Sequence, residues 1–260
     1  MNGELVAPAA AACKLAPDPP ILVAGHSHMC ALVGDLHTVE TRLHPVADHP
    51  NVFALHAPWP RQDEYWQHLK ASAAGMRIAL IWNGNEHNIH YFFLDQRPFD
   101  FVSRHVNKLV PTFSLIPQRR IRQKFREASV DELAAILADL AAGPAKSINV
   151  VGTPPPKKDN EELRKILRNE PVLVNWAEFV GQSLDEIKIT PPYVRLKLWF
   201  LLQEMVADAA RQIGAKFIPV PQEVQDEDGF LKPEYWHPDV THANRLYGDV
   251  MLRRIIQEAA

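Results

Sequence analysis

Short apolar runs alternate with helix-forming stretches along most of this chain, and that alternation limits the folds open to it. The runs occupy 21–25, 52–55, 78–82, 148–151 and 216–220. Short continuous apolar runs are typical of parallel strands that are buried on both faces. The helix-forming stretches occupy 28–36, 61–74, 131–142, 193–213 and 243–258. The pattern predicts an α/β fold, here a flavodoxin-like three-layer α/β/α sandwich with a parallel central sheet.

The domain organisation follows from the length of 260 residues, which fits one large α/β domain. Residues 1–19 are rich in alanine and proline, so we expect a flexible leader there and one folded domain over 20–260. Pro219 predicts that the last strand lies near an edge of the sheet. The stretch 86–130 breaks the alternation, and its place in the fold is left open. Its basic cluster at 119–126 is interpreted as a solvated helix face, with a lid or an anionic-substrate contact as the alternative.

The composition argues against several classes of partner. The formal net charge is -3, which favours neither nucleic acid nor an anionic membrane surface. No run approaches the roughly 18 apolar residues that a membrane-spanning helix needs. The two cysteines, Cys13 and Cys30, are interpreted as reduced thiols. We therefore expect a cytoplasmic protein with no nucleic-acid or membrane partner, and the oligomeric state is left open.

Polar residues follow two of the predicted strands and precede the last helix. The segments are Gly-His-Ser-His at 25–28, Asn-Gly-Asn-Glu at 83–86 and Trp-His-Pro-Asp-Val-Thr-His at 236–242. Ligands of an open parallel sheet bind beyond the carboxyl ends of its strands. We therefore expect the three segments to meet at that edge, where they supply a hydroxyl, an amide and an Asp/His pair.

Ser27 is the candidate nucleophile of this edge. A serine hydroxyl needs a general base, and the base needs a third group that fixes its tautomer and stabilises its cation. His242 is the candidate base, and Asp239, three residues before it, is the candidate third group. The backbone N–H of Ser27 and the side-chain amide of Asn85 are the candidate donors to a developing oxyanion.

Four further residues are expected at or near the pocket. His26 and His28 flank the serine and are interpreted as hydrogen-bonded structural residues, while His237 precedes the Asp/His pair. Gly84 lets its turn adopt a positive φ, which would direct Asn85 inward. No metal ligand and no organic cofactor are predicted.

At these motifs the chain resembles the SGNH (GDSL-like) hydrolase superfamily. That family has Gly-Asp-Ser after its first strand, Gly-x-Asn-Asp after its third and Asp-x-x-His before its terminal helix. Here the corresponding segments are 25–27, 83–86 and 239–242, in the same order and on the same predicted elements. The resemblance covers roughly residues 20–258 and implies an α/β/α hydrolase domain over 20–260.

The chain departs from the family pattern at three places. His26 stands where the family has aspartate, and Asn83 stands where it has the third-block glycine. No glycine occurs between positions 35 and 74, so the second-block glycine, an oxyanion donor in the family, is missing. A backbone donor near His56 or Ala57 is the expected replacement.

The resemblance implies a serine esterase that forms an acyl-serine intermediate, with His242 acting as base and then as acid. The expected substrate is a small-molecule ester, such as an acylated carbohydrate. The same machinery can pass the acyl group to another alcohol, so an acyltransferase is a direct alternative. A non-catalytic binding domain on this scaffold is a second alternative, supported by the missing second-block glycine.

Individual residues also have simpler interpretations. Ser27 is a suitable helix N-cap, Asn85 a suitable turn residue and His242 a suitable first-turn residue.

A metallophosphoesterase is the rival catalytic interpretation, because Gly-His-Ser-His at 25–28 and Asp-Leu-His at 35–37 look like two of that family's metal-binding blocks. In that family the Gly-His-x-His block comes last along the chain, whereas here it comes first, which makes this interpretation the weaker one.

Overall fold

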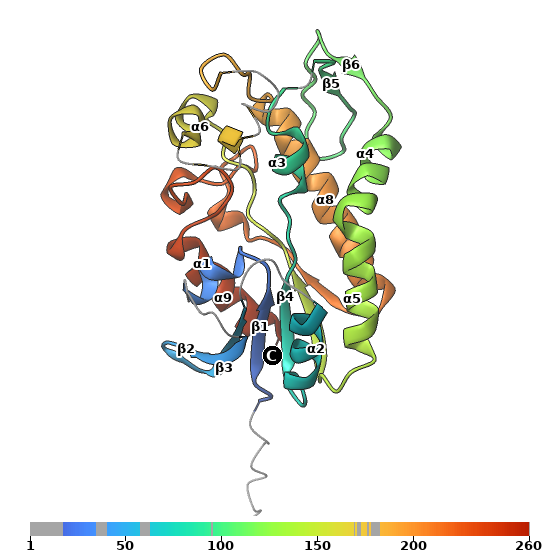
Figure 1. Ribbon diagram of the computed structural model, residues 1–260, viewed down its shortest axis with the longest axis vertical. Coiled ribbons are helices and arrows are strands. Elements are labelled where there is room, and N and C mark those ends of the chain that lie inside the picture. Colours follow the sequence, from blue (N-terminus) through green and yellow to red (C-terminus); the bar gives the residue numbers. More distant parts are fainter. Residues whose placement is uncertain are drawn as a thin grey trace, which may run out of the picture.

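The fold is built on one central sheet (Figure 1). The computed structural model describes residues 18–34, 41–57, 63–94, 96–168, 170, 173–175, 177 and 183–259. Within these ranges a six-stranded sheet has the order β2-β3-β1-β4-β7-β8. Its strands are β1 (Ile21–Gly25), β2 (Arg42–Val46), β3 (His49–His56), β4 (Arg77–Ile81), β7 (Ser147–Val151) and β8 (Lys216–Ile218). All neighbours run parallel except β2, which pairs antiparallel with β3.

The order of the parallel strands creates a switch point between β1 and β4. From β1 the chain steps to β3 on one side, then returns to β4 on the other side and continues outward to β7 and β8. This is the flavodoxin-like order, and a ligand crevice forms where the direction reverses. The predicted architecture is therefore confirmed, and the carboxyl ends of β1 and β4 are the expected place for a site.

Strand β2 corrects the expectation of a wholly parallel sheet. It forms a tight hairpin with β3, in which Asp48 adopts a φ of 62°. The sequence did not indicate this edge strand, because it contains Pro45 and mostly exposed side chains and so has no continuous apolar run. At the opposite edge, β8 lies where Pro219 predicted it.

Two hydrophobic layers cover the sheet. Leu22 and Ala24 of β1 face one layer, and Ile21 and Val23 face the other. The first layer is contributed mainly by α2 (Asp63–Ser72), α5 (Asp131–Ala141) and α8 (Pro192–Gln212), and the second by α1 (Met29–Val33) and α9 (Arg245–Ala259). These helices match the predicted ones to within a few residues where the structure describes them. Helix α1 is shorter than predicted, because it ends before Gly34, whose φ is 89°.

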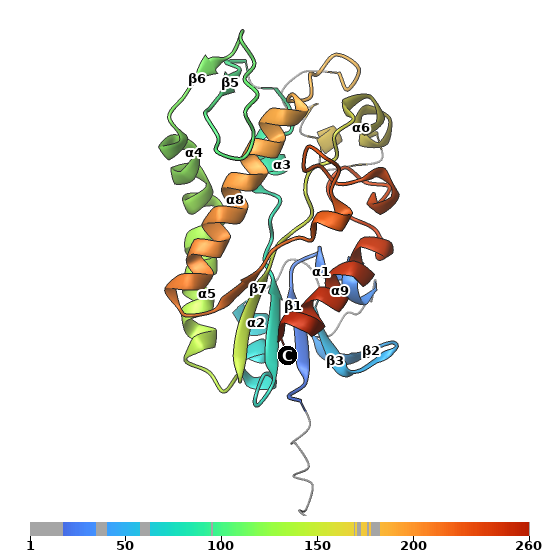
Figure 2. The same cartoon turned by 180° about the vertical axis from the view of Figure 1, so that it is seen from behind.

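The stretch 86–130, which the sequence left unplaced, lies largely beyond the carboxyl ends of the strands (Figures 1 and 2). It contains α3 (Glu86–Tyr91), the short parallel strands β5 (Phe99–Asp100) and β6 (Ser114–Leu115), and α4 (Gln118–Phe125). A π-helical turn then joins α4 to α5. Helix α6 (Asn160–Leu167) lies at the same end of the molecule.

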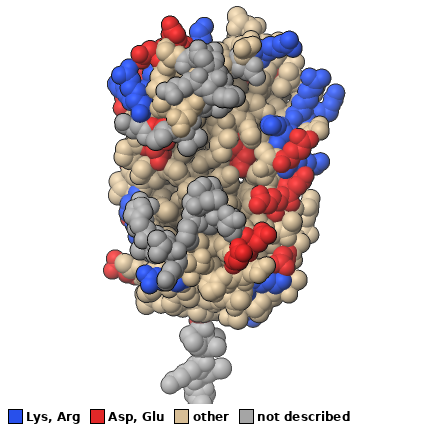
Figure 3. Space-filling view, viewed as in Figure 1, with Lys and Arg blue, Asp and Glu red and all other residues tan. Residues whose placement is uncertain are grey.

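The basic cluster lies on α4 and the turn that follows it. Ile121 and Phe125 are buried, whereas Arg119, Arg120, Lys124 and Arg126 are exposed, as expected for a solvated helix face. Lys and Arg side chains gather at this edge of the surface (Figure 3). Among the described residues, no helix combines the length and apolar character needed to cross a membrane.

Most of the predicted leader, residues 1–17, lies outside the described residues. Its last part is tied to the sheet, because the Asp18 carboxylate pairs with Arg77 at 3.2 Å and its carbonyl accepts a hydrogen bond from Asn51.

Candidate active site

The turn after β1 requires a glycine at position 25. Gly25 has a φ of 121°, and a Cβ atom there would lie 2.1 Å from the carbonyl oxygen of Ile81 in β4. The N–H of His26 donates to that same carbonyl at 2.9 Å. This close approach of the two strands places Ser27 directly at the switch point.

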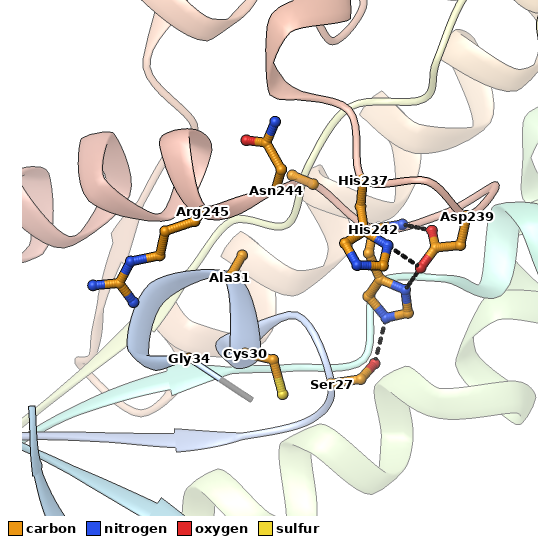
Figure 4. Close-up of a pocket in the computed structure, with 10 residues that line it drawn as sticks. Ser27, Cys30, Ala31, Gly34, His237, Asp239, His242, Asn244 and Arg245 are labelled. Carbon is orange, nitrogen blue, oxygen red and sulfur yellow. Dashed lines mark hydrogen bonds and ion pairs between the residues drawn. The ribbon is translucent and has the colours of Figure 1, made fainter. Parts of the chain in front are cut away.

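Ser27 is hydrogen-bonded to His242, from a segment 215 residues away in sequence (Figure 4). The distance between Ser27 Oγ and His242 Nε2 is 2.8 Å, and His242 Nδ1 lies 2.7 Å from Asp239 Oδ2. A carboxylate only accepts, so Nδ1 carries the proton and Nε2 is left to accept the serine proton. The serine oxygen is therefore directed at an imidazole and is not used as a helix cap.

The Asp239 carboxylate closes the turn that carries His242. Asp239 Oδ1 accepts the N–H groups of Thr241 at 2.9 Å and His242 at 2.6 Å. The local spacing Asp-x-x-His thereby orders both side chains. Burial alone would raise the pKa of Asp239, but the hydrogen bonds and the charge of His242 outweigh it and hold that pKa well below its ordinary value.

A second imidazole shares the same carboxylate oxygen. His237 Nδ1 lies 2.8 Å from Asp239 Oδ2, and the rings of His237 and His242 lie edge to face (Figure 4). The His237 side chain is about half exposed and lines the pocket beside Ser27. Asp239 thus accepts from two histidines, of which only His242 reaches Ser27.

Asn85 follows β4, after the turn at Gly84. Gly84 has the predicted positive φ, 77°, and packs against the Thr153 side chain so closely that a Cβ atom would lie 2.2 Å from its Oγ1. The Asn85 side chain is buried, and its Oδ1 lies 3.1 Å from His28 Nε2. Among the described residues, no acceptor is bonded to Asn85 Nδ2, so the amide retains its donors.

The two histidines that flank the serine are both buried. Burial, and next the charge of nearby His242, lower the pKa of His28 well below its ordinary value, so this ring is neutral and donates through Nε2. His26 packs edge to face on Trp82, with the ring centroids 4.6 Å apart. His28 thus has the hydrogen-bonded surroundings that the sequence analysis expected, whereas the His26 ring is described by its aromatic packing.

A pocket of about 360 Å³ opens beside the serine (Figure 4). Its lining residues are Ser27, Cys30, Ala31, Gly34, His237, Asp239, His242, Ala243, Asn244 and Arg245. His26, His28 and Gly84, which the sequence also assigned to the pocket, are not in this lining. These three residues belong to the turns that follow β1 and β4.

Several expectations concern residues outside the described ranges. Asp35 and His37, the second block of the metallophosphoesterase interpretation, lie there. Residues 58–62 lie there too. They directly follow His56 and Ala57, near which the replacement oxyanion donor is expected and which the structure does describe. Among the residues that the structure does describe, no three His, Cys, Asp or Glu side chains are grouped to hold a metal ion.

Sequence reasoning missed two residues that contact the 236–242 segment. Lys157 donates to backbone carbonyls of this segment, and Glu170 accepts the N–H of Val240 at 3.3 Å. The only available signal is that Lys157 follows the fourth predicted strand, at the same edge as the site.

Comparisons with known proteins extend the description of the fold. No protein-family model and no curated protein matches the chain. A phospholipase A1 from Streptomyces albidoflavus superposes with a TM-score of 0.52 at 10% identity, over 94% of this chain and 100% of that one.

Two further solved structures are similar at lower TM-scores. The periplasmic domain of a Salmonella ser. Paratyphi A lipopolysaccharide acetyltransferase has a TM-score of 0.48 at 14% identity, over 95% of this chain and 85% of that one. A catalytic mutant of an acetylxylan esterase from Geobacillus stearothermophilus has a TM-score of 0.46 at 11% identity, over 95% of this chain and 96% of that one.

Proposed function

We propose that this chain, which has the fold of the SGNH hydrolases, is a serine esterase acting on small-molecule esters. The observation that carries the proposal is the hydrogen-bonded series from Ser27 Oγ through His242 to Asp239, with distances of 2.8 and 2.7 Å. This series lies at the switch point of the sheet and borders the pocket. If Ser27 were only a helix cap and His242 only a first-turn residue, there would be no reason for Ser27, His242 and Asp239 to form one hydrogen-bonded series.

In the first half of the reaction, Ser27 Oγ attacks the ester carbonyl carbon while His242 Nε2 takes the hydroxyl proton. The carbonyl π electrons move onto oxygen and form a tetrahedral oxyanion. Asp239 stays ionised and stabilises the imidazolium. The C–O bond to the leaving alcohol then breaks, and His242 returns the proton to that alcohol, which leaves an acyl-serine.

The developing oxyanion needs donors that are already in place. The backbone N–H of Ser27 donates to no acceptor in the described part of the chain, and the Asn85 amide retains its Nδ2 donors. Both groups follow the strands that meet at the switch point, which supports their proposed role as the oxyanion hole.

In the second half, a water molecule attacks the acyl-serine while His242 again takes and returns a proton. An acceptor alcohol in place of water would make the enzyme an acyltransferase by the same steps. Pocket residues His237 and Arg245 offer polar groups to either acceptor. Release of acetate from an acetylated carbohydrate, with and without an added alcohol acceptor, distinguishes the two outcomes.

Labelling with a fluorophosphonate probe tests the proposal. We expect one labelled residue, Ser27, with labelling and p-nitrophenyl acetate hydrolysis abolished in Ser27→Ala and retained in Ser103→Ala, which changes a serine of the β5–β6 region. Folded wild-type protein that is not labelled would favour the binding-domain alternative. Turnover that is lost with EDTA and restored by manganese would favour the metallophosphoesterase.

A further inference from the structure

Lys157 is buried beneath the segment that carries Asp239 and His242. Its side chain is only 1% exposed, although lysine carries its charge at the end of a long side chain. The Nζ atom donates to the carbonyl of His237 at 2.6 Å and to the carbonyl of Asp239. It also lies 3.9 Å from Asp239 Oδ1, so one ammonium contacts the backbone on both sides of Pro238 and faces the carboxylate.

The backbone of Lys157 is itself held in place. Lys157 pairs with Leu231 in an isolated parallel bridge, and the N–H of Leu231 donates to the carbonyl of Pro156 at 3.2 Å. The Lys157 ammonium therefore extends from a fixed backbone position. From there it can hold the 236–242 loop, although Lys157 and this loop do not belong to a common strand or helix.

A buried ammonium is costly unless it is paired and hydrogen-bonded, and here its partners are two backbone carbonyls and, at 3.9 Å, the Asp239 carboxylate. The titratable groups that face it are Asp239 and Glu170, with His237 and His242 on the same segment. Burial lowers the pKa of Lys157 to about 8, although the charges of Asp239 and Glu170 act in the opposite direction.

We propose that Lys157 is a positioning residue of the esterase site, which holds the Asp239 carboxylate and its segment in place so that the carboxylate is directed at His242. This inference rests on the proposed function. Lys157 acts through the Asp239 carboxylate and through the backbone carbonyls of His237 and Asp239, and it is not itself among the residues that line the pocket. Without the ammonium, two carbonyls lose their donor and the carboxylate loses a counter-charge, so His242 is held less accurately against Ser27.

Substitution of Lys157 by methionine removes the charge and the donors while keeping the length of the side chain. We expect kcat for p-nitrophenyl acetate to fall by about 10- to 100-fold, because misplacement of a reacting group by about 1 Å has an effect of that size. KM should stay within about threefold, since Lys157 does not itself line the pocket. Lys158→Met is the matched control: Lys158 is partly exposed, pairs with Asp228 at 2.8 Å, and should leave kcat unchanged.

The pH profile separates positioning from simple structural support. Wild-type kcat should decline above about pH 8, as Lys157 loses its proton, and Lys158→Met should show the same decline. Lys157→Arg keeps a cation that does not titrate in this range. It should retain activity at pH 7 and lose the alkaline decline, and it serves as the test if Lys157→Met does not fold.

The outcomes are distinct. The role of Lys157 is overturned if Lys157→Met has the wild-type kcat, or if Lys157→Arg shows the same alkaline decline as the wild type. Either result leaves the proposed function intact, provided that fluorophosphonate labels Ser27 in the wild type. A wild type without labelling and without ester hydrolysis overturns the proposed function and the role of Lys157 with it.

Discussion

His28 and Asn85 are joined by a buried hydrogen bond, in which the imidazole Nε2 donates to the carboxamide Oδ1 across 3.1 Å. The bond links the turn after β1 to the turn after β4, the two strands that meet at the switch point. Because Oδ1 is occupied by His28, the amide group of Asn85 is turned away from that ring and keeps its donors for another acceptor.

Asn85→Ala tests the oxyanion role. We expect kcat to fall by about 100- to 1,000-fold with little change in KM, as for removal of one oxyanion donor. Stability should fall by about 1–3 kcal/mol, because the buried His28 donor loses its partner. Steady-state kinetics and urea unfolding measure the two effects. Unchanged kcat in a folded variant would make Asn85 a turn residue only.

His28→Leu tests whether His28 orients the Asn85 amide. In the wild-type background we expect kcat to fall by about tenfold, since the amide loses its fixed orientation. In the Asn85→Ala background the same change should have almost no effect on kcat, because no amide remains to be oriented. Equal losses in both backgrounds, measured as a double-mutant cycle, would argue for an indirect effect on folding.

The shared carboxylate predicts unequal roles for the two histidines on Asp239. His242→Ala should lower kcat by about 10³-fold or more, because the base that contacts Ser27 is lost. His237→Ala should lower kcat by less than about tenfold, because His242 keeps both of its partners. Kinetics of the two variants, with circular dichroism as a folding control, decide the point. The reverse ranking would assign the base to His237.

Buried neutral histidines should make the protein sensitive to mild acid. Burial lowers the pKa of His87 to about 3 and that of His28 well below 6.5. The unfolded chain binds protons first as the pH falls, so stability is fully present above about pH 6.5 and is lost below it. Two such groups predict a decrease of up to about 2.7 kcal/mol per pH unit, at about 1.4 kcal/mol per proton.

Urea unfolding between pH 7 and pH 4 measures this slope. His87→Asn keeps a donor for the Gly84 carbonyl but removes the titrating ring, so the slope should decrease by about one proton. His68→Asn, at an exposed position, should leave the slope as it is. An identical slope in wild type and His87→Asn would show that His87 does not contribute.

The ion pair between Asp100 and Lys197 should dominate attachment of the β5–β6 region to α8. Both side chains are 0% exposed, and Asp100 also accepts the N–H groups of Phe101 at 2.7 Å and Val110 at 2.9 Å. Lys197→Met leaves a buried carboxylate unpaired, so we expect a loss of about 3–5 kcal/mol in urea unfolding.

Asp100→Asn added to Lys197→Met should recover part of that loss, because the amide oxygen still accepts the N–H bonds without a charge. Arg211→Met, which breaks an exposed pair with Asp208, should have little effect. A Lys197→Met variant as stable as the wild type would mean that the β5–β6 region is held by its apolar contacts.

The sequence alone was sufficient for features that depend on local pattern. The buried strand β1 and the α/β alternation follow from the spacing of apolar residues, since each strand and helix shows its own periodicity. The pairing of Asp239 with His242 is also local, because a side chain three residues away can close its own turn. The meeting of Ser27 and His242 was expected from the general rule that strand ends gather at one edge and from the order of the family motifs.

Only the tertiary structure decided the features that depend on contacts between distant segments. Lys157 reaches Asp239 across 82 residues, and Lys197 pairs with Asp100 across 97, and the sequence indicates neither pairing. The hydrogen bond of His28 to Asn85 and the edge strand β2 were hidden for the same reason. A polar residue acquires such a role through burial beside a particular partner, and burial of that kind is set by the packing of the whole chain.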